Sequence, residues 1–157
     1  MKRLLLFAFI LVLAVSFSSC MKVVDVPAPP QPVVNPLDGS WVISSAEESD
    51  GYGWQPISPA YGNGIFDFYD QGSVQYKDPS IVLTGTWYTV SSTDSYYDEY
   101  GNYYSGAHQG LELDITDFYS GNALILSFDY ISFINSNSFV VTYFDGKYTE
   151  RVTFSRY

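Results

Sequence analysis

The residues best suited to recognising a ligand gather in one short segment, 92–108, which reads STDSYYDEYGNYYSGAH. It holds five tyrosines, three acids and the single histidine of the chain. A tyrosine ring offers a flat apolar face with a polar hydroxyl at its edge. Such rings beside carboxylates suit sugars, which stack through their C–H faces, and they also suit protein contacts, where tyrosine is enriched. The candidate ligand-binding residues are Trp54, Tyr96, Tyr97, Tyr100, Tyr103 and Tyr104.

Two interpretations of this segment stay open. In the first, the tyrosines form the rim of a binding site, to which Tyr52 and Trp54 of the stretch DGYGWQP (50–56) contribute. In the second, segment 92–108 is a long hairpin whose tyrosines pack along a sheet, or a flexible loop. The composition does not separate the two, because tyrosine serves both packing and binding.

Signatures of catalysis and of metal binding are weak. A Ser-His-Asp triad needs an oriented imidazole, and the only candidate, His108, lies in an expected loop without a nucleophile elbow. No spacing among the 17 acids singles out a carboxylate pair for glycoside cleavage. Asp94, Asp98 and Glu99 do not follow the ligand pattern of an EF-hand, and one histidine with one cysteine makes no zinc site. We expect no enzyme, no catalytic residue, no metal and no cofactor.

The only cysteine, Cys20, ends a stretch that has the order of a secretory signal. Lys2 and Arg3 precede twelve uninterrupted apolar residues, 4–15, and small serines follow. Twelve apolar residues are too few to span a bilayer, which takes about 20. Basic, apolar and small residues in this order predict a signal peptide over residues 1–19.

The residues FSSC at 17–20 resemble the lipobox of bacterial lipoproteins, in the relaxed form common in Bacteroidota, although Phe17 and Ser19 depart from the usual residues. The resemblance implies that Cys20 becomes the first mature residue and carries acyl groups such as palmitate. Two or more acyl chains hold a protein firmly at a membrane. The expected location is the cell envelope, at the outer membrane, with the membrane as partner through Cys20. The alternative is ordinary signal cleavage, which leaves a free thiol.

A proline-rich tether and one folded domain are expected after the signal. Residues 20–36 hold five of the eight prolines, which favours extended polyproline geometry. The alternative is a first strand at Val23, Val24 and Val26, which the prolines would end quickly. The folded domain is expected at 37–157, a length that suits a single domain.

The chain is acidic, with a formal net charge of −10, and the two bases of the signal lie ahead of all 17 acids. The mature chain is therefore more acidic still. An acidic protein repels the phosphate backbone of nucleic acids and the anionic headgroups of a membrane. We expect no nucleic acid partner, and membrane contact through the acyl anchor alone.

Beyond residue 37 the apolar residues alternate with a period of two, as Leu111, Leu113 and Ile115 do, which indicates half-buried strands. Turn residues such as Asp145 and Gly146 separate the runs and predict hairpins. Short links favour an all-β, antiparallel up-and-down meander that closes into a β-barrel. A two-sheet sandwich is the competing fold. About eight strands are expected, at 39–46, 64–70, 73–78, 80–91, 109–117, 123–129 with 130–134 merging into a turn or bend, 138–144 and 147–156.

The stretch LDGSW (37–41) carries a further resemblance, because a Gly-x-Trp that opens the first strand of such a meander is similar to the lipocalins. The chain looks like the lipocalin-like lipoproteins of Bacteroidota, through this stretch, IFDFYDQGSVQY (65–76), LTGTWY (83–88) and residues 135–156. The resemblance implies a lipocalin-like β-barrel in which Arg156, or failing that Arg151, crosses the ring of Trp41 as a structural cation–π contact. It also implies a cup for a small apolar ligand, although side chains can equally fill an eight-stranded barrel.

Two functional hypotheses follow. The first is a lipid-anchored envelope protein that binds a small apolar molecule in the barrel cup, or a ligand on the tyrosine-rich rim. The second is a surface interaction module with a solid core, which binds a glycan or a partner protein through segment 92–108. An open cavity favours the first hypothesis, whereas a filled interior with outward tyrosines favours the second. A small hydrolase is a distant third, and a buried carboxylate pair in a cleft would favour it.

Overall fold

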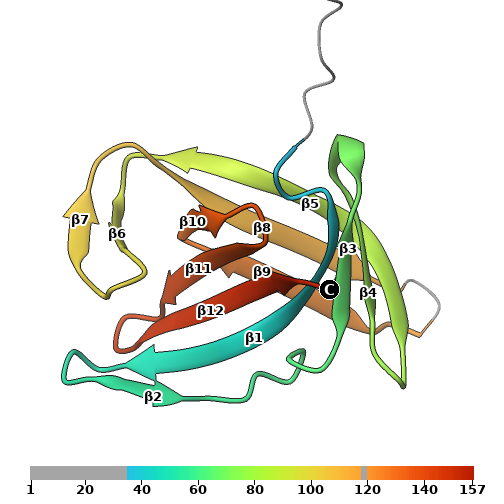
Figure 1. Ribbon diagram of the computed structural model, residues 1–157, viewed down its shortest axis with the longest axis horizontal. Coiled ribbons are helices and arrows are strands. Elements are labelled where there is room, and N and C mark those ends of the chain that lie inside the picture. The colour runs from blue at the N-terminus through green and yellow to red at the C-terminus, as the bar shows by residue number, and fades with distance from the viewer. Residues whose placement is uncertain (1–34, 118–119) are drawn as a thin grey trace, which may run out of the picture. The chain divides into compact units, whose positions relative to one another are not determined.

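The computed structural model describes residues 35–117 and 120–157 (Figure 1). The predicted signal peptide, 1–19, the predicted acylation site Cys20 and the tether up to residue 34 lie outside the described residues. Within the described part the fold is all-β and antiparallel, which confirms that prediction. The helical content of this part is one 3-10 turn, η2 (Asp70–Gly72).

Ten of the described strands form one sheet and two form a separate hairpin. The sheet has the order β10-β11-β12-β1-β3-β4-β5-β8-β9, with β2 paired to β1, while β6 pairs with β7. This is an up-and-down meander whose last strand returns to its first. The strands are β1 (Gly39–Ser49), β2 (Trp54–Pro56), β3 (Ile65–Phe68), β4 (Ser73–Lys77), β5 (Val82–Ser92), β6 (Ser95–Tyr97), β7 (Tyr103–Ser105), β8 (His108–Thr116), β9 (Ala123–Phe128), β10 (Tyr130–Asn135), β11 (Ser138–Phe144) and β12 (Thr149–Arg156).

The predicted count of about eight strands is too low, because the two long links of the sequence contain strands of their own. β2 lies in the first link, and β6 and β7 lie in the second. Each of these strands has three residues, and so short a run shows no measurable alternation of apolar and polar residues. Eight of the other nine strands match the predicted segments to within a few residues, whereas β10 is a strand of six residues where the sequence predicts a segment that merges into a turn or bend.

The sheet is open between β9 and β10, so hydrogen bonding does not close it into the expected barrel. These two strands follow each other along the chain with only Asp129 between them. The Asp129 N–H donates to the carbonyl of Thr142, and the Asp129 carboxylate accepts from the N–H of Phe144 at 2.8 Å. These bonds turn the chain from β8, the partner of β9, towards β11, the partner of β10. The bend at Asp129 is therefore the physical reason for the open seam.

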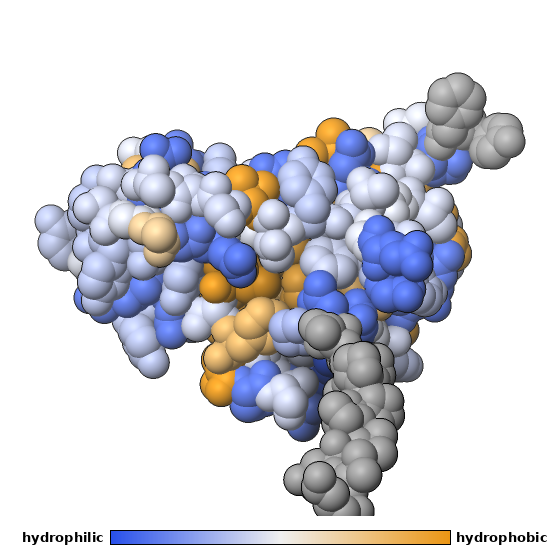
Figure 2. All heavy atoms as spheres, turned by 90° about the horizontal axis from the view of Figure 1, so that it is seen from above, coloured by the Kyte–Doolittle hydropathy of each residue, from blue (hydrophilic) through white to orange (hydrophobic). Residues whose placement is uncertain are grey.

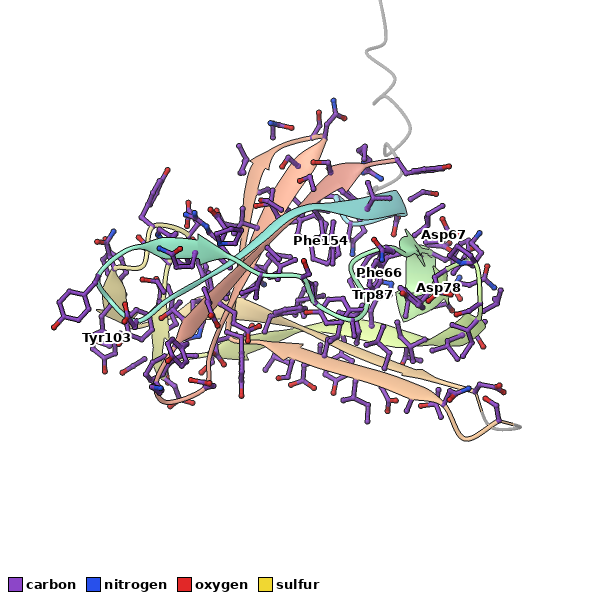
Figure 3. The ribbon with its side chains drawn as sticks, turned by 90° about the horizontal axis from the view of Figure 1, so that it is seen from below. Phe66, Asp67, Asp78, Trp87, Tyr103 and Phe154 are labelled. Atoms are coloured by element: carbon purple, nitrogen blue, oxygen red, sulfur yellow. The ribbon has the colours of Figure 1, made fainter. Side chains whose placement is uncertain are left out.

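The interior of the sheet is filled by large apolar side chains from alternate strand positions. Trp41, Phe66, Phe68, Phe139 and Phe154 are fully buried. The ring centroids of Trp41 and Phe139 lie 4.7 Å apart, and those of Phe66 and Phe154 lie 5.5 Å apart, both in the edge-to-face arrangement that aromatic rings favour. Phe66 and Phe154 lie close together between strands that cross in Figure 3. Burial of each such side chain contributes roughly 1.5–3 kcal/mol to stability.

The end of the sheet at which the described chain begins is closed by Arg156, whose guanidinium lies 4.0 Å from the centroid of the Trp41 ring. Arg156 also donates to the carbonyl of Asp38, and the Trp41 Nε1–H donates to the carbonyl of Leu37 at 2.7 Å. Gly39 lies against the guanidinium with a φ of 119°, and a Cβ there would overlap Arg156. Glycine is therefore required at this position both for the backbone conformation and for the space.

Candidate functional site

The five tyrosines of the second long link lie on a small antiparallel hairpin, residues 95–105, which we call the tyrosine hairpin. Its strands are β6 and β7, and it projects between β5 and β8 at the left of Figure 1. The pairing places Tyr96 opposite Tyr104 and Tyr97 opposite Tyr103. Side chains alternate across a strand, so each of these pairs occupies its own face of the hairpin.

Asp98 fixes the tip of the tyrosine hairpin. Its side chain is buried, and its Oδ1 accepts from the backbone N–H groups of Tyr100 at 2.9 Å and Asn102 at 2.8 Å. Its Oδ2 accepts from the side-chain amide of Asn102 at 3.1 Å. The Gly101 N–H donates to the Asp98 carbonyl, and Gly101 has a φ of 84°. An aspartate that binds the following backbone amides stabilises a tight turn, so the tip has a defined conformation.

The face of the hairpin that carries Tyr97 packs onto β11. The buried hydroxyl of Thr142 donates to the Tyr97 carbonyl at 2.5 Å. The Tyr97 ring contacts Phe144 with a centroid separation of 4.9 Å, and it meets Tyr103 edge-on at 5.3 Å. The hairpin is thus attached to the large sheet by a hydrogen bond from a threonine side chain to its backbone as well as by its rings.

Arg151 of β12 joins three segments at this end of the sheet. Its Nη1–H donates to the Glu99 carbonyl of the tyrosine hairpin at 2.6 Å, and its Nη2–H donates to the Glu47 carboxylate of β1, also at 2.6 Å. Its guanidinium lies over the Trp54 ring of β2, 3.9 Å from the centroid. Gly101 lies so close to Trp54 that a Cβ there would come within 3.2 Å of the ring. Arg151 therefore lies over Trp54, while Arg156 occupies the position over Trp41.

Tyr96 lies at the centre of a stack of rings on the other face of the hairpin. Its centroid lies 4.2 Å from that of His108, 4.9 Å from that of Tyr130 and 5.9 Å from that of Tyr104. The His108 Nδ1 lies 2.8 Å from the Gly106 carbonyl, which can only accept, so Nδ1 carries the hydrogen. The hydrogen bond that orients His108 therefore involves the backbone, and the ring packs against tyrosine.

The six residues predicted to bind a ligand fall into two groups. Trp54, Tyr96 and Tyr97 are partly buried, and their rings pack against other side chains of the protein. Tyr100, Tyr103 and Tyr104 are exposed, the first two by 72% and 63%. Figure 3 shows Tyr103 at the outer edge of the molecule. In Figure 2 the left end, over β6 and β7, carries little strongly hydrophobic surface, while orange side chains gather nearer the middle. Polar aromatic surface is therefore the main feature of this end.

The turn between β1 and β2 adds a shallow acidic pocket of about 250 Å³. Glu48 and Glu150 face each other in register across β1 and β12. Burial raises the pKa of the Glu150 carboxyl, and the negative charges of Glu48 and Asp145 raise it further. The pocket is lined by Glu48, Asp50, Tyr52, Gly53, Gln55 and Tyr148.

Sequence reasoning missed the residues that position the tyrosines. The sequence pattern indicates Arg151 only as an alternative partner of Trp41, and it does not single out Glu47, Tyr130 or Thr142. The one available signal was the pairing of β1 with β12, which sets Glu47 opposite Arg151. Opposite charges directly across an antiparallel pair attract, but that register is visible only once the two ends of the domain have been aligned.

Among residues 35–117 and 120–157, no group of three or more His, Cys, Asp or Glu side chains has an arrangement that could hold a metal ion. In the same residues no helix has the length and apolar character needed to cross a membrane. Comparison of the chain with protein-family models, with curated proteins and with solved structures found no match. The function must therefore be inferred from the geometry of the chain itself.

Proposed function

We propose that this chain is a non-catalytic, lipid-anchored binding protein of the cell envelope that recognises carbohydrate through the exposed tyrosines of the tyrosine hairpin. The observation that carries the proposal is the exposure of Tyr100 and Tyr103 on a tip whose backbone is already fixed by Asp98 and Arg151. A surface that is ordered before the ligand arrives loses little conformational entropy on binding.

The chemistry around these rings supports a sugar as ligand. Tyr100 and Tyr103 offer flat faces for the C–H surface of a pyranose ring. The hydroxyl groups of the exposed Tyr100, Tyr103 and Tyr104 can donate hydrogen bonds to the hydroxyl groups of the sugar and can accept from them. The strongly acidic composition of the chain disfavours anionic polymers, so a neutral or amino sugar fits best.

The packing of the interior supports this surface site over a ligand in a barrel cup. Trp41, Phe139 and Phe154 are fully buried, and the rings of Phe139 and Phe154 stack with centroids 4.7 Å apart. Side chains that pack in contact in this way leave no space between them for a ligand. The filled interior with outward tyrosines is the arrangement expected of a surface interaction module.

We also propose that the fold is a lipocalin-like barrel with one seam left open. The support is the cyclic order of the strands, in which β12 pairs with β1, and the contact of Arg156 with Trp41.

The membrane anchor is proposed at Cys20, on the sequence FSSC alone. Replacing Cys20 with serine should move the protein from the membrane fraction to the soluble fraction, and continued membrane association would argue against the anchor.

The test of the proposed function is a glycan array screened with the detergent-solubilised full chain. The double variant Tyr100→Ser/Tyr103→Ser should weaken binding at least roughly tenfold, the change expected when about 1.4 kcal/mol of ring contact is lost. Tyr157→Ser is the matched control, because Tyr157 is also exposed and lies away from the hairpin in Figure 1. Equal loss in both variants, or an apolar molecule that co-purifies in native mass spectrometry, would overturn the proposal.

A further inference from the structure

The outer edge of β9 has no strand partner among the described residues. β9 pairs with β8 on one side only, and it is the last strand in the order of the large sheet. A strand edge of this kind presents N–H and C=O groups that can form hydrogen bonds with another extended chain. β9 therefore has the backbone groups needed to accept an added strand.

The residues of β9 lack the features that normally keep such an edge unpaired. The strand reads ALILSF, with no charge, no proline and no glycine. Ile125 is 71% exposed on its outer face, and Leu124 and Leu126 on its inner face are only partly buried. On the other side of the seam, Ile134 of β10 is 58% exposed. Soluble proteins usually protect strand edges with lysine, proline or bulges. The apolar edge of β9 has no lysine or proline and is therefore suited to binding another strand.

The outer face beside this edge carries negative charge. Glu112 and Asp114 of β8 lie opposite Ser127 and Ile125 of β9. The basic residues of the described chain lie elsewhere, at Lys77 on β4, Lys147 in the turn before β12, and Arg151 and Arg156 on β12. Neither β5, β8 nor β9 carries a lysine or arginine. The outer face of these three strands therefore attracts a cationic partner.

A cavity at the Phe128 end of the strand adds a specific acceptor for a positive charge. It has a volume of about 140 Å³ and lies where the base of the tyrosine hairpin meets β8 and β9. Its walls include the acidic side chains of Asp94, Glu112 and Asp129 together with Ser127 and His108. A long basic side chain that crosses β9 can bury its aliphatic stem on the strand and place its charged head among these carboxylates.

We infer that the open edge of β9 binds an extended segment of a partner protein in which apolar and basic residues alternate. Neighbouring strands lie about 4.8 Å apart, and their side chains alternate between the two faces of the sheet. The apolar residues of the segment then cover Leu124 and Leu126 inside the seam. Its basic residues lie outside, beside Ile125, and reach Asp114 and the cavity near Glu112. A second copy of β9 would supply no cation to these acids, which is why charge favours a basic partner.

The experiment uses the full chain and a blocked, fluorescently labelled peptide that alternates valine and lysine. Fluorescence anisotropy should show saturable binding that weakens with added salt. Hydrogen–deuterium exchange of the complex should slow at the amides of 123–128. The same peptide with glutamate in place of lysine, and one with methylated backbone nitrogens, should both fail to bind.

Two single variants separate the edge from general surface attraction. Ile125→Lys places a cation where the lysines of the peptide are expected, and it should weaken binding about tenfold. Tyr157→Lys is the matched control, because Tyr157 is also an exposed residue and follows β12, which pairs with neither β8 nor β9, and this change should leave the affinity unchanged.

Three results would overturn the inference. The first is an equal loss of affinity in both variants, and the second is protection from exchange outside 123–128. The third is a dimer of the unliganded chain, seen by sedimentation, in which 123–128 is already protected. That last result would assign the edge to a second copy of this chain. None of these outcomes depends on the glycan array, so the binding site at β9 and the proposed carbohydrate site are tested independently.

Discussion

Two arginines of β12 each cover a tryptophan, yet the two contacts have different surroundings. Arg156 lies over Trp41, which is fully buried, and it donates to the backbone carbonyls of Pro36, Asp38 and Ser136. Arg151 lies over Trp54, which is only partly buried, and it also donates to the Glu47 carboxylate and to the Glu99 carbonyl of the tyrosine hairpin. The same pair of residue types therefore closes the core at one end and positions a surface element at the other.

Because Trp41 is fully buried and Trp54 only partly buried, the two contacts are expected to contribute differently to stability. At the Trp41 end, a side chain in a filled interior contributes through packing, and its removal leaves a cavity. At the Trp54 end, water screens the charge of Arg151, and its ion pair with Glu47 contributes modestly to stability. The contacts around Trp41 should therefore determine most of the free energy of unfolding. The contacts around Trp54 should determine the position of the tyrosine hairpin.

The largest effect is expected from Trp41→Ala, which should lower the free energy of unfolding by about 3–5 kcal/mol. Trp41 is fully buried and contacts Phe139, so its neighbours cannot collapse into the space without losing their own packing. Urea denaturation followed by circular dichroism measures the loss. Trp54→Ala is the matched control and should cost much less. Equal costs would mean that the two ends do not differ in the way proposed.

Arg151→Met should lower the free energy of unfolding less, by about 1–3 kcal/mol, since it removes hydrogen bonds of a charged group that is only partly buried. The amides of 95–105 should exchange faster with deuterium, and glycan affinity should fall. Arg156→Met provides the control, because it should destabilise the whole sheet without changing the order of exchange within the hairpin. Faster local exchange of 95–105 in Arg156→Met would contradict the proposal that Arg151, and not Arg156, positions the tyrosine hairpin.

A smaller effect is expected from Asp98→Ala, about 1 kcal/mol, because Tyr100 and Asn102, which donate to the buried carboxylate, are exposed and can donate to water instead. Exchange should quicken at Tyr100 and Asn102 alone, and glycan binding should weaken with the core unchanged. Asp98→Asn should restore most of the affinity, since its amide oxygen can still accept from both backbone groups. If Asp98→Asn behaves like Asp98→Ala, the charge of Asp98, rather than its geometry, holds the tip.

The smallest predicted effect is the contribution of Glu150 to the pH dependence of the free energy of unfolding. Burial raises the pKa of Glu150 above its ordinary value of 4.5, and Glu48 and Asp145 raise it further. The folded state therefore holds this proton more tightly than the unfolded chain. The resulting stability is complete below about pH 4.5 and is lost as the pH rises through the folded pKa.

Glu150→Gln should accordingly be more stable than the natural chain near neutral pH, by less than about 1 kcal/mol because solvent screens the group. The advantage should vanish in acid, and denaturation curves across the pH range measure it. Glu48→Gln should act in the same direction, because it removes one of the two repelling charges. A Glu150→Gln variant that is less stable at neutral pH would show that the carboxylate forms a favourable contact.

The sequence is sufficient to predict most strands of the sheet and some residues of the candidate site. Alternation marks the long strands, and Asp145 with Gly146 forms the expected turn, in which the Asp145 carboxylate accepts from the N–H groups of Lys147 and Tyr148. The open seam was harder to predict, since the bend at Asp129 depends on partners in β11 that lie 13 or more residues away. The tyrosines were found by composition alone, whereas the role of Arg151 depends on the register of β1 with β12.

The pairing of β1 with β12 also has a consequence for how the protein is made. Trp41 lies opposite Arg156 in this ladder, so one edge of β1 stays unpaired until β12 has been synthesised, although β3 pairs with the other edge. Contacts between positions so far apart in sequence form slowly. A chain that stops before β12 exposes one edge of β1 and part of the aromatic interior, which makes it a substrate for proteases. Resistance to proteases should thus depend on synthesis through β12, because Phe154 of this strand fills part of the interior and the strand pairs with the edge of β1.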